Sequence, residues 1–174
     1  MKERKLRSSA QSWTSAERLA SENRLFAILD ACDAPAVPRK AEELGVERAI
    51  PLYLGRLDAV HWPIGPYLFH LDKPTLNWIA AALKREPWGI FAVPESPEEV
   101  LQKLFAHFQK FVTIRVRDEE LYLRFYDPRV LPQYLHRAPE DKMREFFGPC
   151  RFLGAANAQS DRAEPGELSW YWLE

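Results

Sequence analysis

The sequence predicts an α/β fold: a single domain in which a mixed β-sheet is flanked by helices and which includes an antiparallel hairpin. Short apolar segments typical of buried strands alternate with amphipathic helical segments through much of the chain. Two segments of alternating polarity, joined by a short polar link, then indicate the hairpin. The length of 174 residues fits one domain, and 14 prolines divide it into short elements.

Composition narrows the class of protein. With 24 basic and 25 acidic residues the net charge is −1, which argues against a uniformly basic nucleic-acid binder. The two cysteines fit a reducing compartment, and by themselves they form neither a disulfide framework nor a four-ligand zinc site. The basic start of the chain is not followed by the apolar segment of a signal peptide, and no stretch has the length and apolarity of a membrane helix. We therefore expect a cytoplasmic protein without a membrane partner.

Aromatic residues make up 13% of the chain and include six tryptophans. Such a content is typical of an aromatic-rich core, but tryptophan and tyrosine also dominate recognition surfaces. Composition leaves both interpretations open.

The first part of the chain divides into an arm and the start of the domain. Residues 1–22 are polar and are expected to form a flexible arm that ends in a helical turn near residues 14–21. The single α/β domain is then expected to span residues 23–174. Helices are predicted at residues 38–44, ended by Gly45, and at 74–83, opened by Pro74. Strands are predicted at residues 24–30, 49–55, 65–71 and 88–93.

The clearest helix start in the sequence lies at Ser96. Ser96 is a capping residue, Pro97 stands at the first helical position and Glu99 completes a capping box. The helix that follows carries apolar side chains on one side: Val100, Leu101, Leu104, Phe105 and Phe108.

The hairpin is predicted from residues 111–117 and 121–126, linked by the polar residues 118–120. One face is apolar and is expected to join the core: Val112, Ile114, Val116, Leu121, Leu123 and Phe125. The other face places arginines beside tyrosine rings: Thr113, Arg115, Arg117, Tyr122, Arg124 and Tyr126.

Prolines set the helix boundaries in the last third of the chain. Because Pro132 would break a helix that begins at Pro128, we predict that the helix begins near Leu131 with Pro132 in its first turn. Another helix begins at Pro139 and ends at Gly148. The chain is then predicted to form a short strand at 152–153, a surface loop at 154–167 and a final strand at 168–173.

No motif typical of a cofactor, metal or catalytic site is present. The seven glycines are scattered, so the sequence holds no glycine-rich phosphate loop. The four histidines are far apart and form neither an HxH nor an HExxH motif. We therefore expect no cofactor, no metal site and no catalytic residue, and we interpret His70 and His107 as packing residues.

The densest polar cluster is the run Arg124-Phe125-Tyr126-Asp127-Pro128-Arg129. Two arginines near an aspartate at a strand exit could bind a phosphate or a carboxylate. The simpler interpretation is structural: Asp127 caps the turn that it begins, and Arg124 or Arg129 pairs with it. A small hydrolase that uses Asp127 together with a histidine remains a third possibility.

Taken in order, these segments resemble the small type VI secretion adaptors, also called effector chaperones (Tap/TEC proteins). The resemblance runs from about Leu25 to Gly148, and its most specific part is the run from Arg124 to Leu131. Phe108 and Gln109 after His107 differ from the Leu-Arg that the family often has there. The weaker matching segments are Leu25–Ala31, Pro51–Gly55, Gly65–Leu68, Leu101–Val116 and Phe147–Pro149.

The resemblance implies a non-enzymatic protein that binds a toxic effector in the producing bacterium and keeps it soluble. Its further partner would be the VgrG spike protein or a PAAR-repeat tip protein, onto which the effector is loaded. The alternative is an immunity protein that neutralises a co-encoded toxin. Our candidate partner-binding residues are Tyr122, Arg124, Tyr126 and Arg129. Structural roles in the motif are expected for His107, Asp127 and Pro128.

Overall fold

The computed structural model describes residues 5–32, 34–55, 64–82, 88–96, 100–156 and 167–174. These residues form a seven-stranded sheet in the order β1-β9-β8-β5-β2-β4-β3, six helices, and a separate two-stranded sheet of β6 and β7. The strands are β1 (Leu6–Ser12), β2 (Leu25–Asp30), β3 (Ala49–Pro51), β4 (Pro66–Leu71), β5 (Gly89–Pro94), β6 (Thr113–Val116), β7 (Glu119–Tyr122), β8 (Cys150–Ala156) and β9 (Glu167–Leu173). The helices are α1 (Thr14–Ser21), α2 (Ala36–Leu44), α3 (Lys73–Ala82), α4 (Val100–Phe108), α5 (Leu131–Arg137) and α6 (Glu140–Phe147).

The predicted α/β domain with a helix-flanked sheet and an antiparallel hairpin is confirmed. Every described strand pairing is antiparallel, however, so the sheet is not mixed. The reason is visible at β2, which lies between β4 and β5 and is antiparallel to both. β4 and β5, which α3 connects, therefore run in the same direction but are not neighbours.

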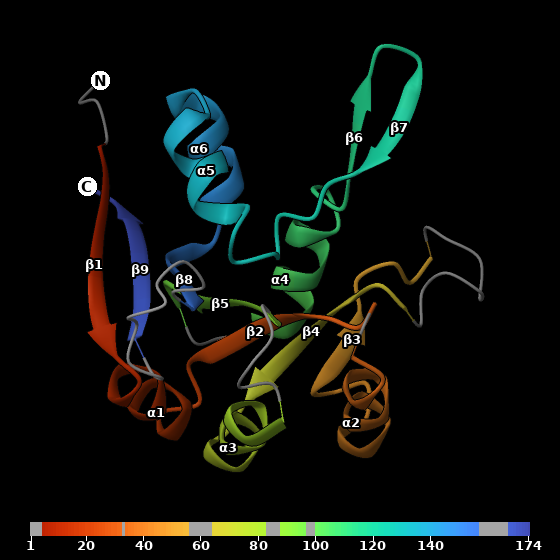
Figure 1. Cartoon of the computed structure of the whole chain (residues 1–174), viewed down its shortest axis with the longest axis vertical. Coiled ribbons are helices and arrows are strands. Elements are labelled where there is room, and N and C mark those ends of the chain that lie inside the picture. The colour runs from red at the N-terminus through yellow and green to blue at the C-terminus, as the bar shows by residue number, and fades with distance from the viewer. Residues whose placement is uncertain (1–4, 33, 56–63, 83–87, 97–99, 157–166) are drawn as a thin grey trace.

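Alternate side chains of the strands enter two cores on opposite faces of the sheet, as a side-chain period of two requires. On β2, Leu25, Ala27 and Leu29 enter the first core, on the face covered by α1, α2 and α3. Phe26 and Ile28 enter the second core, on the opposite face, which α4, α5 and α6 cover. Figure 1 shows these two helix layers on the two sides of the sheet.

The aromatic content serves mainly these cores. Trp88 and Trp170 are buried, and Trp13 and Trp78 pack against the same cluster. Trp172 is half-buried on β9 and its ring contacts Phe152, with the ring centres 6.0 Å apart. Composition left open whether the tryptophans belong to the core or to a recognition surface. The described tryptophans favour the core, and Trp172 lies at the margin of the core.

The flexible arm predicted for residues 1–22 is wrong for the residues that the structure describes. β1 pairs with β9 over its whole length, from Leu6 opposite Leu173 to Ser12 opposite Glu167. α1 follows and buries Ala16 and Ala20 in the first core. The prediction failed because an edge strand is held by backbone hydrogen bonds and needs few apolar side chains.

Several helix boundaries agree with the prediction, and the proline and glycine signals account for them. α5 begins at Leu131 with a proline in its first turn, α6 ends before Gly148, and α2 ends before Gly45, whose φ is +77°. The capping box at Ser96, Pro97 and Glu99 falls partly outside the described residues. β8 extends to Ala156, into the segment 154–167 that we predicted as a loop, because its backbone pairs with β5 and β9.

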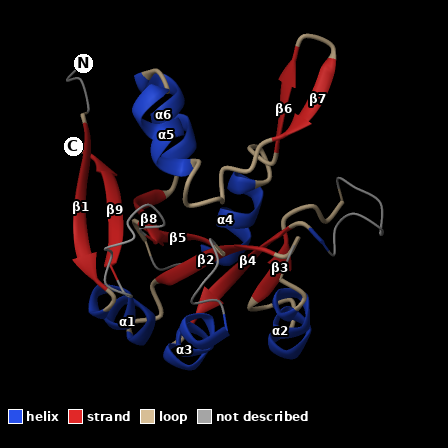
Figure 2. Cartoon of the chain, in the orientation of Figure 1, coloured by secondary structure: helices blue, strands red, loops and turns tan. Residues whose placement is uncertain are grey.

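The hairpin differs most from its prediction. Arg117 has a φ of +57°, and this left-handed residue allows a two-residue turn at Arg117 and Asp118 in place of the three-residue link. The strands are accordingly short, and Figure 2 shows that they project away from the main sheet. Val112 and Phe125 are buried at its base as expected, but Ile114 and Leu121 are exposed.

Candidate partner-binding surface

The predicted partner-binding residues lie at the base of the hairpin, beside the end of β2. The Arg124 side chain forms an ion pair with the Asp30 carboxylate, which also accepts a hydrogen bond of 3.0 Å from the Cys32 backbone N–H. This contact joins residues 94 positions apart in the sequence. It ties the segment that follows β7 to the sheet.

Tyr126 is buried, with 3% of its surface exposed, and is therefore not a surface contact as predicted. Its hydroxyl shares a hydrogen bond with the hydroxyl of Tyr53. Burial and this hydrogen bond raise the pKa of Tyr126 far above its ordinary value, so the phenol remains neutral. The prediction failed because Phe125 and Tyr126, although adjacent, both turn inward where the chain leaves the hairpin.

Asp127 and Arg129 form a local bidentate pair. The Arg129 guanidinium donates from Nε to Asp127 Oδ1 at 2.9 Å and from Nη2 to Oδ2 at 2.6 Å, and the Arg129 backbone N–H donates to Oδ1 at 2.9 Å. Burial alone would raise the pKa of Asp127, but these hydrogen bonds outweigh it and the pKa is lowered. With Asp127 and Pro128 buried, these are the contacts that a structural role predicts.

We name the residues at this position the base cluster: Asp30, Tyr53, Arg124, Tyr126, Asp127 and Arg129. Its charges are compensated within the chain, because each aspartate of the cluster is paired with one of its arginines. The described cluster therefore works as an internal anchor for the hairpin.

His107 lies in the second core, as the packing interpretation requires. Its Nε2 atom lies 2.8 Å from the Phe146 carbonyl oxygen, and its ring contacts Phe108 and Phe111. Burial lowers the pKa of His107, although the contact with Phe146 opposes this shift. Gly148 presses on the ring, and a Cβ atom there would lie 2.1 Å from His107 Cε1, which explains why a glycine stands at this position.

The projecting hairpin carries the accessible apolar side chains of this region. Ile114 and Leu121 lie opposite each other in the ladder and are 39% and 44% exposed. Tyr122 is 54% exposed, and its ring contacts Tyr53 with the centres 5.5 Å apart. Because successive side chains of a strand point to opposite faces, Tyr122 lies on the other face of the ribbon from Ile114 and Leu121. We name these three residues of the two faces, Ile114, Leu121 and Tyr122, the hairpin surface. Sequence reasoning missed its two aliphatic members because alternation shows that a face is apolar but not what covers it.

Among the described residues there is no cluster of histidines, cysteines and carboxylates that could hold a metal ion. In the same part of the chain no helix combines the length and the apolarity needed to cross a membrane. His70 stacks on Phe26, with the ring centres 4.6 Å apart, and its Nε2 atom lies 3.1 Å from the Asn23 carbonyl oxygen.

Comparison with known protein families gives a match over residues 25–145 to the model of a family described as a domain of unknown function (DUF4123). Neither the curated proteins nor the solved structures give a significant match. The matched span begins with β2 and ends within α6, so it includes the base cluster and the hairpin surface. β1, α1, β8 and β9 lie outside it.

Proposed function

Because the chain belongs to the family described as a domain of unknown function (DUF4123), we propose that it is a non-enzymatic type VI secretion adaptor. In this role it binds a toxic effector in the cytoplasm of the producing cell and loads it onto a VgrG spike or PAAR-repeat tip protein. The resemblance of the run Arg124–Leu131 to such adaptors supports the proposal, and this run lies inside the matched span.

The observation that carries the proposal is the hairpin surface. A two-stranded ribbon that stands alone in water is only marginally stable, and exposed aromatic and aliphatic side chains on it favour contact with a partner. The base cluster holds the ribbon in place through Arg124 and Tyr126, whereas Ile114, Leu121 and Tyr122 remain accessible. A protein that masks apolar segments of an effector needs such a surface.

Because Tyr126 is buried, we revise our proposal for the contact residues. Tyr122 keeps its place, and Ile114 and Leu121 replace Tyr126. The side chains of Arg124 and Arg129 are about half exposed, 49% and 52%, but their charged ends engage Asp30 and Asp127. We therefore assign these two arginines to holding the hairpin, and the hairpin surface to the effector.

A hydrolytic role for Asp127 is the weaker hypothesis. Both of its carboxylate oxygens accept hydrogen bonds from the Arg129 guanidinium, and its pKa is lowered. A general base needs a free oxygen within reach of a substrate proton and benefits from a raised pKa. These contacts support a structural carboxylate.

The test is co-expression of the tagged chain with the toxin and the spike protein encoded beside it, in pairs and together. Recovery of a ternary complex, in which the toxin reaches the spike only when this chain is present, supports the adaptor. Recovery of an inactive toxin without the spike would overturn the adaptor and indicate an immunity protein.

The hairpin surface is tested in the same assay with Ile114→Ser, Leu121→Ser and Tyr122→Ser combined. We expect toxin recovery to fall by about tenfold or more, because apolar anchors dominate binding energy. Val46→Ser is the matched control, since Val46 is 74% exposed and lies outside the hairpin. Equal loss in the control, or no loss in the triple variant, would assign the contact elsewhere.

A further inference from the structure

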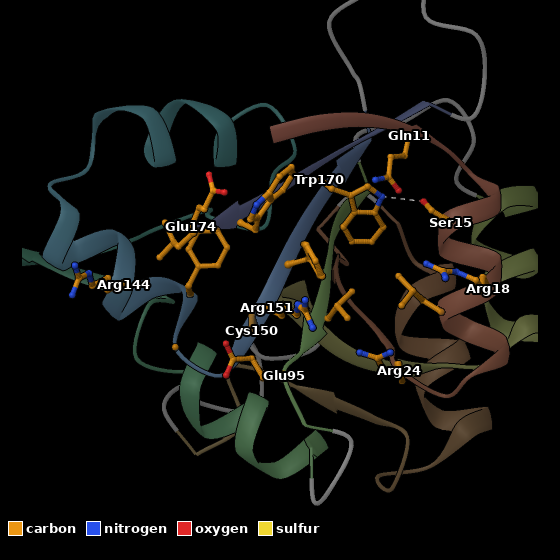
Figure 3. Close-up of a pocket in the computed structure, with 17 residues that line it drawn as sticks. Gln11, Ser15, Arg18, Arg24, Glu95, Arg144, Cys150, Arg151, Trp170 and Glu174 are labelled. Atoms are coloured by element: carbon orange, nitrogen blue, oxygen red, sulfur yellow. Dashed lines mark hydrogen bonds between the residues drawn. The ribbon is translucent and has the colours of Figure 1, made fainter. Parts of the chain in front are cut away.

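An open groove lies away from the hairpin. Its volume is about 990 Å³, and residues of β5, β8 and β9 line it together with α1 on one side and the last turn of α6 on the other. Figure 3 shows Arg18 and Arg24 at the α1 side, Arg144 at the opposite side, and Trp170 and Arg151 between them. We name this feature the arginine groove.

The lining combines aromatic rings with arginines. Trp170 is fixed by a hydrogen bond of 3.0 Å from its indole Nε1 to Ser15 Oγ, so its ring is held in one orientation. Phe152 and Trp172 stand side by side on neighbouring strands and are only half-buried. The Arg151 guanidinium lies 5.4 Å from the centre of the Phe152 ring. Tryptophan and arginine in a concave surface are the residues most enriched at binding hot spots.

The charge of the groove differs from that of the chain. Four arginines and two glutamates line it, whereas the whole chain has a net charge of −1. Glu174 is already paired with Arg7 at 2.6 Å, and Arg24 lies 3.5 Å from Glu22. No carboxylate of the described residues lies within ion-pair distance of Arg18 or Arg151, and both side chains are exposed. The groove therefore has unused positive charge beside apolar rings.

We propose that the arginine groove binds an acidic segment of a partner protein, with aromatic or aliphatic side chains between its carboxylates. The carboxylates pair with Arg18 and Arg151, and the apolar side chains pack on the half-buried rings of Phe152 and Trp172, behind which Trp170 is buried. The inference rests on the adaptor role proposed above for the source of the segment.

A segment of protein suits the groove better than a small ligand or a nucleic acid. The volume lies at the upper end of the range for small-molecule pockets and the groove is open to solvent, so it has room for several side chains. Glu95 and Glu174 within the lining would repel a continuous phosphate backbone. An acidic peptide with spaced carboxylates can avoid both glutamates.

The groove is also built mostly from residues outside the matched family span of 25–145. Arg18, Arg24, Arg151, Trp170 and Trp172 all lie before or after it. The hairpin surface, by contrast, lies within the span. Family membership therefore does not account for the groove, because most of its lining lies outside the matched span.

The test uses the full chain and a fluorescent peptide that contains aspartate, glutamate, leucine and tryptophan. Fluorescence anisotropy compares it with a peptide in which lysines replace the acidic residues, and with a single-stranded oligothymidine. The variant Arg18→Glu combined with Arg151→Glu should weaken binding of the acidic peptide by about tenfold or more, because it reverses both unpaired charges.

Arg39→Glu is the matched control, since Arg39 is an exposed helix arginine on α2 outside the groove. It should leave affinity unchanged. Arg18→Gln combined with Arg151→Gln should give an intermediate loss, and thermal melting checks that each variant is folded. Raising the salt concentration should weaken the parent complex more than that of the reversed variant.

Preference for the acidic peptide, lost in the reversed variant, supports the proposal. Equal binding of the acidic and lysine peptides, or no effect of reversal, overturns it, and tighter binding of the oligothymidine overturns it in favour of a nucleic acid. If the reversed variant still joins toxin and spike, the groove proposal fails while the adaptor role stands. If the parent binds the acidic peptide but joins no toxin to the spike, the adaptor role fails.

Discussion

The base cluster and the arginine groove use the same residue types for opposite purposes. In the base cluster Arg124 and Arg129 meet carboxylates of their own chain, and Tyr126 is buried against Tyr53. In the groove Arg18 and Arg151 are exposed and meet no described carboxylate at ion-pair distance. An arginine beside an aromatic ring therefore indicates a site for a partner's carboxylate only when no carboxylate of its own chain pairs with it.

The two regions also differ in what their loss should do. The base cluster lies between secondary-structure elements, so its removal should be measured as lost stability. Arg18 and Arg151 of the groove are exposed, so their replacement should affect binding and leave stability unchanged.

The sharpest test compares two tyrosines four residues apart. Tyr126→Ala should lower the free energy of unfolding by about 3–5 kcal/mol, the range for truncating a buried aromatic side chain. Tyr122→Ala should cost no more than about 1 kcal/mol, because Tyr122 is 54% exposed. Urea denaturation followed by tryptophan fluorescence measures both. A Tyr126→Ala protein that is as stable as the parent but no longer binds the toxin would indicate that Tyr126 contacts the toxin.

The second prediction compares the arginines of the two regions. Arg124→Gln should destabilise the chain by about 1–2 kcal/mol, because it removes the charge partner of the largely buried Asp30. Arg151→Gln should change the free energy of unfolding by no more than about 0.5 kcal/mol, as expected for an exposed surface residue. The difference is measured from the midpoints of urea denaturation, provided that the free energy of unfolding depends on urea with the same slope in each variant. A similar loss of unfolding free energy in both variants would contradict the distinction between the base cluster and the arginine groove.

The third prediction concerns acid stability at His107, next to the groove residue Gly148. Because the pKa of His107 is lowered in the folded chain, the unfolded chain binds the proton more readily. Stability should therefore fall as the pH drops below the ordinary histidine value of 6.5 towards the lowered pKa. Asp127 has a lowered pKa as well, but its contribution is lost only below its ordinary value of 3.8, in a separate window.

Thermal melting across this pH range measures the effect of His107. His107→Gln should remove the loss of stability just below pH 6.5, whereas His136→Gln, at an exposed position, should retain it. The same pH dependence in all three proteins would assign the effect to another group.

The smallest effect is chemical and leaves stability untouched. Cys32, beside the base cluster, is exposed, whereas Cys150 in the groove lining is buried and its pKa is raised by burial and, less strongly, by Glu95. Because the thiolate is the reactive form, a disulfide reagent should label Cys32 in the folded protein and Cys150 only after unfolding. Rapid labelling of both thiols would show that the groove lining opens in solution.

Local features of the fold could be predicted from the sequence. Pro132 indicated the start of α5, and Gly45 and Gly148 marked the ends of α2 and α6. Asp127 pairs with Arg129, one of the two arginines that the sequence offered as its partner. Each depends on steric or hydrogen-bonding preferences of a few consecutive residues. The apolar face of α4 was predictable for the same reason, because helical periodicity is a local property.

The candidate sites required tertiary structure. Arg124 finds Asp30 across 94 positions, and β1 pairs with β9 through backbone groups that leave no side-chain pattern. The groove likewise needs α1, β8 and β9, which are far apart in the chain. Apolar periodicity determines which faces of an element can be buried, but only the packing of distant elements decides which of them are covered. For this reason Tyr126 became core, Leu121 became surface, and two arginines were left facing an open groove.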